Sequence, residues 1–127
     1  MKGLPALGKL IAQIKQACKK KYLLGITKRR LHIRSEHSAL NVLLQSLGAY
    51  ISKVWMIEAH RLFKENKIQV TQLGWIHDEI QVECNKGDAE LVAKLLVQAA
   101  NNTQTILGLR CRIDAEAKIG RNWYEVH

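Results

Sequence analysis

Apolar residues recur along the chain at two different spacings, and the change of spacing separates helices from strands. Three segments place apolar residues three and four positions apart, which is typical of helices buried along one face. This spacing predicts helices over residues 5–21, 35–66 and 88–105. Ser35 and Asp88 belong to the residue types that favour a helix start, and Gly108 belongs to the type that ends one. The middle helix, about 30 residues long, is expected to form the backbone of the domain.

Other segments alternate apolar and polar residues, as half-buried strands do. The strands predicted in this way cover residues 22–26, 30–34, 67–76, 80–84 and 109–114. The first two are joined by a turn at residues 27–29 and the next two by His77-Asp78-Glu79, and such short connections require antiparallel hairpins. The order of elements predicts an α+β fold, in which an antiparallel sheet packs against the long helix and two further helices.

Length and composition limit the possible classes of protein. The 127 residues suit one domain, and 47% hydrophobic and 24% charged residues are ordinary for a globular chain. No apolar run reaches the roughly 18 to 20 residues of a membrane span, so no membrane partner is expected. Three widely spaced cysteines argue against a disulfide framework and favour a reducing compartment. We therefore expect a cytoplasmic protein.

Positive charge is concentrated near the start of the chain. Residues 1–35 hold ten of the 20 lysines and arginines and none of the 11 acidic residues, and the net charge of the chain is +9. Such segregation is typical of a surface that binds a polyanion such as nucleic acid. A solvated basic surface and a contact with an acidic protein remain open alternatives.

The sharpest local pattern is the triplet His77-Asp78-Glu79 between two apolar strands. A hairpin tip presents adjacent carboxylates on a rigid support, and Mg²⁺ binds through one or two protein carboxylates together with phosphates. An ordinary polar turn would explain the same residues. Zinc is disfavoured because His32 and His37 have no further ligands at a suitable spacing. The serines lack the glycines of a nucleophile elbow, and the chain has no glycine-rich phosphate loop.

A second group of polar residues follows Ser35 along the long helix. His37, Asn41 and Gln45 are four residues apart and therefore share one face. Side-chain amides of this kind can bind base edges or sugars of nucleic acid. A polar stripe that faces water is the alternative explanation.

Three segments of the chain read VTQLGWIHDEIQVEC, GITKRRLHIRSEHSALNVLLQSLGAYISKVWMI and KIGRNWYEVH. They resemble the A-family DNA polymerases, closest to the replicative enzymes of short-tailed phages. The first resembles motif C of that family, the second resembles the arginine-rich hairpin and long helix of its palm, and the third resembles its Asn-Trp…His ending. The resemblance implies that the protein works in a bacterial host cell or a phage-infected cell.

The resemblance implies a role for each candidate residue. Asp78 would bind two catalytic Mg²⁺ ions, with Glu79 supporting the metal or the primer terminus and His77 contacting the primer end. Six further residues would contact primer–template DNA, either from the long helix or through backbone phosphates: His37, Asn41, Gln45, Lys28, Arg29 and Arg30. No nucleotide-binding residue of the family matches a position in this chain.

The family's motif A aspartate, which shares the two metal ions, and its fingers helix lie upstream of the matched region. The resemblance therefore predicts a single partial domain, with residues 1–35 at the base of the fingers and residues 36–127 forming the C-terminal half of the palm. Such a chain would be inactive alone and would need an upstream polymerase fragment as partner. Lys21 and Lys28 stand where the family often has glycine. A non-catalytic primer–template-binding module and an inactive remnant are the alternatives.

Overall fold

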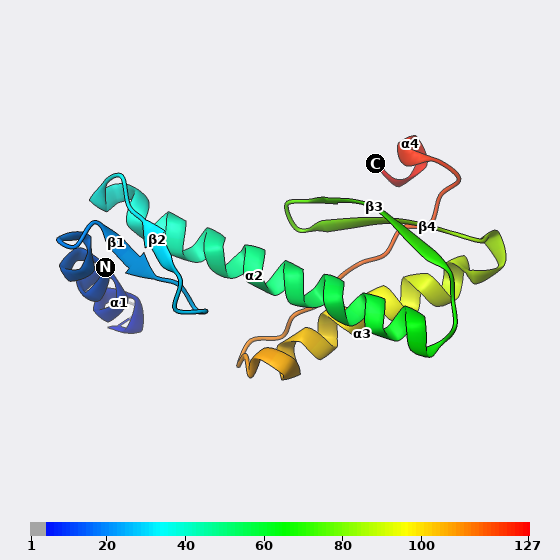
Figure 1. The fold of residues 1–127 in the computed structure, drawn as a ribbon, viewed down its shortest axis with the longest axis horizontal. Coiled ribbons are helices and arrows are strands. Elements are labelled where there is room, and N and C mark those ends of the chain that lie inside the picture. Colours follow the sequence, from blue (N-terminus) through cyan, green and yellow to red (C-terminus); the bar gives the residue numbers. More distant parts are fainter. Residues whose placement is uncertain (1–4) are drawn as a thin grey trace. The chain divides into compact units, whose positions relative to one another are not determined.

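A computed structural model describes residues 5–127 and confirms the α+β fold class (Figure 1). The elements in order are α1 (Pro5–Cys18), β1 (Tyr22–Leu24), β2 (Arg30–His32), α2 (Glu36–Glu65), β3 (Val70–Ile76), β4 (Glu79–Cys84), a short 3-10 helix (Lys86–Asp88), α3 (Ala89–Leu107) and α4 (Trp123–Val126). The chain divides into two compact units, Met1–Tyr50 and Ile51–His127, with the boundary inside α2. The single partial domain expected from the sequence stays a prediction.

The first unit packs the β1–β2 hairpin against α1 and the start of α2. Ile14, Leu23, Ile33 and Ala39 are buried together and form its core. The strands pair antiparallel, with Tyr22 opposite His32 and Leu24 opposite Arg30, as the alternation predicts. The predicted first helix ends three residues early, at Cys18.

The start of α2 is fixed by two serines. The Ser38 backbone N–H donates to Ser35 Oγ at 3.3 Å, and Ser38 Oγ donates to the Ser35 carbonyl at 2.9 Å. These bonds satisfy polar groups that a helix end leaves without intrahelical partners. The helix start predicted at Ser35 is therefore confirmed.

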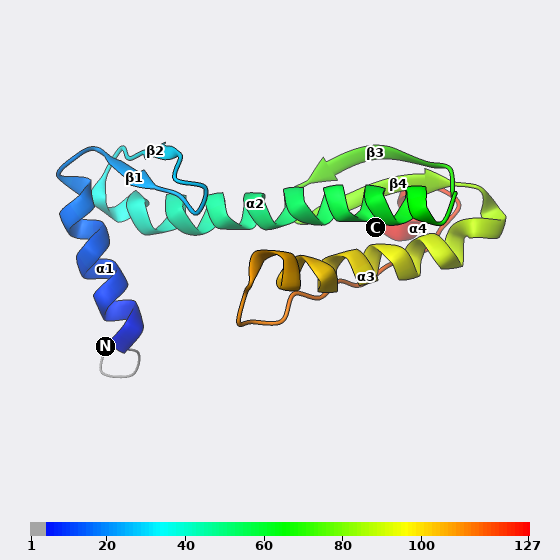
Figure 2. The ribbon, with the colours of Figure 1, turned by 60° about the horizontal axis from the view of Figure 1, so that its bottom comes forward.

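The second unit has a core shared by α2, α3 and the β3–β4 hairpin. The buried residues of its hydrophobic cluster all come from the two helices: Ala59, Leu62, Phe63, Val92, Leu95 and Ala99. In Figure 2, α3 runs alongside the second half of α2. The two helices are also linked by Trp55 Nε1, which donates to the Leu96 carbonyl at 2.8 Å.

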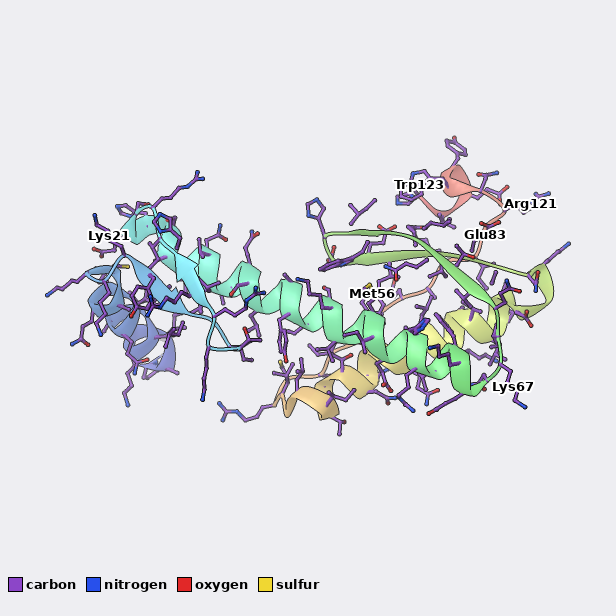
Figure 3. All side chains as sticks on the ribbon, viewed as in Figure 1. Lys21, Met56, Lys67, Glu83, Arg121 and Trp123 are labelled. Atoms are coloured by element: carbon purple, nitrogen blue, oxygen red, sulfur yellow. The ribbon has the colours of Figure 1, made fainter. Side chains whose placement is uncertain are left out.

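The strands cover this core from the other side. Val70, Val82 and Cys84 pack against the buried cluster, and Met56 lies on the side of α2 that faces the hairpin (Figure 3). A register shift between Gln72 and Gly74 interrupts the pairing of β3 with β4. The hairpin is thus held on a rigid helical support, as the sequence pattern predicts.

Two expectations from the sequence are wrong. Residues 109–114 form no strand. Apolar and polar residues alternate there, but within residues 5–127 no neighbouring strand lies where this segment could pair with it. Asp88 precedes α3 but makes no side-chain capping bond, because a short 3-10 turn already leads into the helix. Gly108, by contrast, ends α3 at φ 62°, as expected.

Among the helices of residues 5–127, none combines the length and the apolar character that crossing a membrane requires.

Candidate functional site

The tip of the β3–β4 hairpin is a two-residue turn made by His77 and Asp78. Ile76 pairs with Glu79, so Glu79 is the first residue of β4 and not part of the turn as predicted. His77 adopts a left-handed φ of 55°, and Trp75 Nε1 donates to the His77 carbonyl at 2.9 Å. Asp78 is exposed to solvent at the tip. The turn therefore presents one exposed carboxylate on a backbone that Trp75 braces.

Glu79 lies beside Asp78 and is held by two side chains. Its Oε1 lies 3.0 Å from His127 Nε2 and also accepts a hydrogen bond from Gln81. His127 in turn stacks on Trp123, with ring centroids 4.0 Å apart, and α4 lies beside the hairpin (Figures 1 and 3). The short helix α4 therefore fixes the position of the second carboxylate.

The approach of α4 depends on a close backbone contact at Gly120. A Cβ atom at this position would lie 2.7 Å from Glu125 Cβ and 2.9 Å from Val126 Cγ1. Asn122 then starts the helix, because its side-chain oxygen accepts from the Glu125 N–H at 3.1 Å. The sequence pattern does not mark His127 as a site residue, because His127 stands 48 positions after Glu79. A capping Asn five residues before a His was the available signal.

The chemistry of the tip suits Mg²⁺ only in part. Within residues 5–127, no three His, Cys, Asp or Glu side chains gather in a way that could hold a metal ion. Asp78 and Glu79 nevertheless provide hard oxygen ligands, and Mg²⁺ commonly binds through one or two carboxylates while phosphates and water complete its shell. The residues present fit a site that further ligands complete.

The polar face of α2 is exposed. His37, Asn41 and Gln45 are all solvent-accessible, and Gln45 Nε2 approaches Asn41 Oδ1 at 3.5 Å. The two amides therefore share a surface and keep donors and acceptors for an outside partner.

The basic turn of the β1–β2 hairpin is also exposed. Lys28 has a left-handed φ of 61°, and its neighbours Arg29 and Arg30 face solvent. The Arg30 guanidinium lies 4.8 Å from the centroid of the Tyr22 ring, a cation–π contact that orients it. The turn thus concentrates positive charge on one short loop.

The nine predicted site residues fall into two groups. His77, Asp78 and Glu79 lie together in the unit Ile51–His127. The unit Met1–Tyr50 contains the other six: Lys28, Arg29, Arg30, His37, Asn41 and Gln45.

Comparisons with known proteins give one consistent result. The family model of DNA polymerase family A matches residues 10–125. The DNA-directed DNA polymerases of Enterobacteria phage T3 and Escherichia phage T7 are 38% and 35% identical to the chain over 119 residues. Each match covers 86% of this chain and 16% of the relative. The DNA polymerase I of Bacillus caldotenax is 30% identical over 84% of this chain and 12% of its own length.

A solved structure supports the fold. The polymerase domain of Pol1 from M. smegmatis, in complex with DNA primer-template and dNTP, superposes with a TM-score of 0.65 at 24% identity. The match covers 76% of this chain and 19% of that structure. The resemblance inferred from the sequence is confirmed, and the chain spans about a sixth of the length of its phage relatives.

Proposed function

The chain belongs to DNA polymerase family A, and from that premise we propose that it forms the C-terminal part of a polymerase palm and takes part in nucleotidyl transfer. In the proposed reaction, the primer 3′ hydroxyl attacks the α-phosphate of a nucleoside triphosphate and pyrophosphate leaves. The observation that carries the proposal is the braced hairpin tip, which presents Asp78 to solvent with Glu79 beside it. The relatives from phages T3 and T7 are named DNA-directed DNA polymerases.

Asp78 and Glu79 are the residues that would hold Mg²⁺. When bound there, two such ions would supply Lewis-acid chemistry for the primer hydroxyl and the leaving pyrophosphate. Asp78 is the better candidate to contact both, because Glu79 is already engaged by His127 and Gln81. In this proposal, Glu79 supports the geometry of the tip, and His77 contacts the primer end.

The exposed polar groups of the other unit provide contacts to DNA. His37, Asn41 and Gln45 would meet the primer–template duplex through neutral donors and acceptors. Lys28, Arg29 and Arg30 would meet backbone phosphates, which attract cations without reading sequence. Together the two groups would hold a primer–template duplex on this unit.

These residues make up only part of an active site. Two-metal catalysis needs carboxylates from more than one place, and residues 5–127 offer the Asp78–Glu79 pair without a third nearby ligand. We infer that a motif A aspartate and the nucleotide-binding fingers come from polymerase segments outside these 127 residues, on the same chain or a separate one. A DNA-binding module without catalysis is less well supported, because it would give no role to the exposed carboxylate of Asp78.

A chimeric polymerase tests this proposal. The matching segment of the phage T3 enzyme, 38% identical over 119 residues, would be replaced by the present chain. Template-dependent primer extension by the chimera, and none by the 127-residue chain alone, is the expected result. A chimera that folds and binds primer–template yet extends no primer would contradict the catalytic role.

A further inference from the structure

A broad depression of about 700 Å³ lies in the unit Met1–Tyr50, between the end of α1, the open end of the β1–β2 hairpin and the first turn of α2. The basic and acidic residues of its lining are Lys15, Lys19, Lys21, His32, Arg34 and Glu36. Figure 3 labels Lys21 close to the first turn of α2. None of these residues is among those assigned above to DNA contacts, so the depression is a separate basic surface.

The positive charge of the depression is largely uncompensated. Glu36 is the one acidic residue in its lining, and its Oε1 lies 3.3 Å from Lys15 Nζ, which pairs the two. Lys19, Lys21 and Arg34 are solvent-exposed and form no ion pair within the part of the chain that the structure describes. Three cations that converge on one concave surface favour an anionic partner.

Lys21 occupies a backbone position that suits glycine better. Its φ is 59°, a left-handed conformation in which an L side chain is disfavoured. The backbone is fixed on both sides, because the Lys21 N–H donates to the Cys18 carbonyl at 2.9 Å and its carbonyl accepts from the Ile33 N–H at 3.2 Å. The lysine thus adds charge at the edge of the depression at a conformational cost that glycine would avoid.

The depression lies at the opposite end of the β1–β2 hairpin from the basic turn. Tyr22 pairs with His32 at the open end and Leu24 pairs with Arg30 next to the turn. Strands rise about 3.3 Å per residue, so the two groups of cations are separated by roughly 10 Å along the hairpin. One DNA strand, with a charge about every 3.4 Å of helix axis, could reach both groups.

We propose that this depression binds phosphates of the DNA backbone and extends the contact made by the basic turn. The inference rests on the proposed function, since it takes primer–template DNA as the partner. Phosphate fits because lysine and arginine dominate the charged lining, whereas the centres of protein–protein interfaces are depleted in lysine. Lysine and arginine both bind phosphate oxygens well.

A pair of double variants tests the assignment. Lys19→Gln with Lys21→Gln removes two charges from the depression, and Lys9→Gln with Lys20→Gln removes two that do not line it. Binding of the 127-residue chain to a fluorescent primer–template duplex would be titrated with salt, with circular dichroism as the check of folding. The depression variant should bind about tenfold more weakly near 0.1 M salt, with the slope of log K against log salt reduced by about one to two. The control variant should bind within about twofold of the parent.

Lys21→Gly separates binding from stability. Glycine suits a φ of 59°, so the melting temperature should stay the same or rise while DNA affinity falls severalfold. A fall in melting temperature together with affinity would mean that Lys21 acts through the fold, and it would overturn the assigned contact.

The remaining outcomes distinguish the two proposals. Equal weakening in both double variants would indicate a general positive field and no site. If the depression variant binds normally while joint replacement of Lys28, Arg29 and Arg30 flattens the slope, the inference fails and the proposed function stands. If neither change alters the slope of log K against log salt, the proposal that the unit Met1–Tyr50 binds DNA is contradicted as well. Polyglutamate of equal charge should compete at least tenfold less well than DNA, and equal competition would point to an acidic protein instead.

Discussion

At the scale of single residues, the carboxylate of Glu58 is buried and hydrogen-bonded within the fold, whereas the carboxylate of Asp78 at the candidate site is exposed. Glu58 is 6% exposed and accepts from Arg61 Nε at 2.8 Å and Nη2 at 2.7 Å. Asn102 Nδ2, from α3, donates to the same carboxylate at 2.7 Å. Asp78, in contrast, is exposed. A buried carboxylate with its hydrogen bonds satisfied stabilises the fold, whereas an exposed one is free to bind a ligand.

The hydrogen bonds between Glu58 and Arg61 predict how the free energy of unfolding changes at low pH. The Arg61 hydrogen bonds lower the pKa of Glu58 below its usual range, against the opposing effect of burial, and the Asn102 bond lowers it further. A carboxyl with a lower pKa in the folded than in the unfolded state stabilises the protein above the unfolded pKa. That contribution is lost as pH falls below about 4.5 through the folded pKa.

Glu58→Gln should therefore destabilise the chain by about 1–3 kcal/mol at neutral pH and reduce the loss of stability below about pH 4.5. Urea unfolding at several pH values measures both effects. Glu65→Gln, which removes an exposed partner of the same Arg61, is the matched control and should change stability by less than about 1 kcal/mol. Parallel pH dependence in the parent and Glu58→Gln would rule out the role of this pair.

At the scale of elements, the turns and helix ends decide where the site residues lie. Gly108 ends α3 at φ 62°, and the Leu109 N–H then donates to the Gln104 carbonyl at 3.0 Å. This closure turns the chain away from α3 and into the segment that leads to α4 and His127. The position of the Glu79 carboxylate, which His127 contacts, thus depends on Gly108.

Gly108→Ala should destabilise the chain by about 1 kcal/mol, because an L side chain is disfavoured at this φ. Gly8→Ala is the opposite control. Gly8 lies within α1, and a methyl group added there would meet no atom within 4 Å, so alanine should leave stability the same or raise it by up to about 1 kcal/mol. Thermal unfolding compares the two variants, and equal effects would contradict the role of the left-handed cap.

The polar face of α2 makes a prediction of a different kind. Joint replacement of Asn41 and Gln45 by alanine removes neutral groups, so the salt dependence of DNA binding should stay unchanged. If the amides place the primer end, extension by the chimeric polymerase should still fall at least severalfold. Primer extension and salt titration on the same variant measure both. A flattened salt slope with normal extension would show that this face does not act as proposed.

The sequence predicts elements better than it predicts contacts between distant segments. The His77-Asp78-Glu79 tip can be found from the sequence because apolar and polar residues alternate on both sides of it. Two strands joined by so short a connection can pair only as an antiparallel hairpin. The same alternation in Leu109–Ile113 predicts a strand that does not exist, since pattern alone does not provide a pairing partner. The His127–Glu79 contact escapes prediction because it depends on how α4 folds back at Gly120, which local periodicity does not encode.

At the scale of the whole chain, the uncompensated basic residues and the candidate catalytic carboxylates lie in different units. The basic residues without acidic neighbours belong to residues 1–35, whereas the candidate carboxylates lie at residues 78 and 79. Membership of DNA polymerase family A agrees with the proposal that the cations hold DNA phosphates and that the carboxylates serve the reacting end. The chain spans 16% of its phage relatives, so full activity is proposed only for a larger assembly.

The most direct test of this account compares Asp78→Asn with Glu83→Gln in the chimeric polymerase. Both changes neutralise one exposed carboxylate on the same hairpin, but only Asp78 lies at the tip. If Asp78 binds both metal ions, its loss should slow single-nucleotide extension about a thousandfold or more while DNA affinity stays near that of the parent. Glu83→Gln should extend primers within a few-fold of the parent rate. An Asp78→Asn enzyme that also stays within a few-fold would contradict the central claim that this hairpin tip carries the catalytic carboxylate.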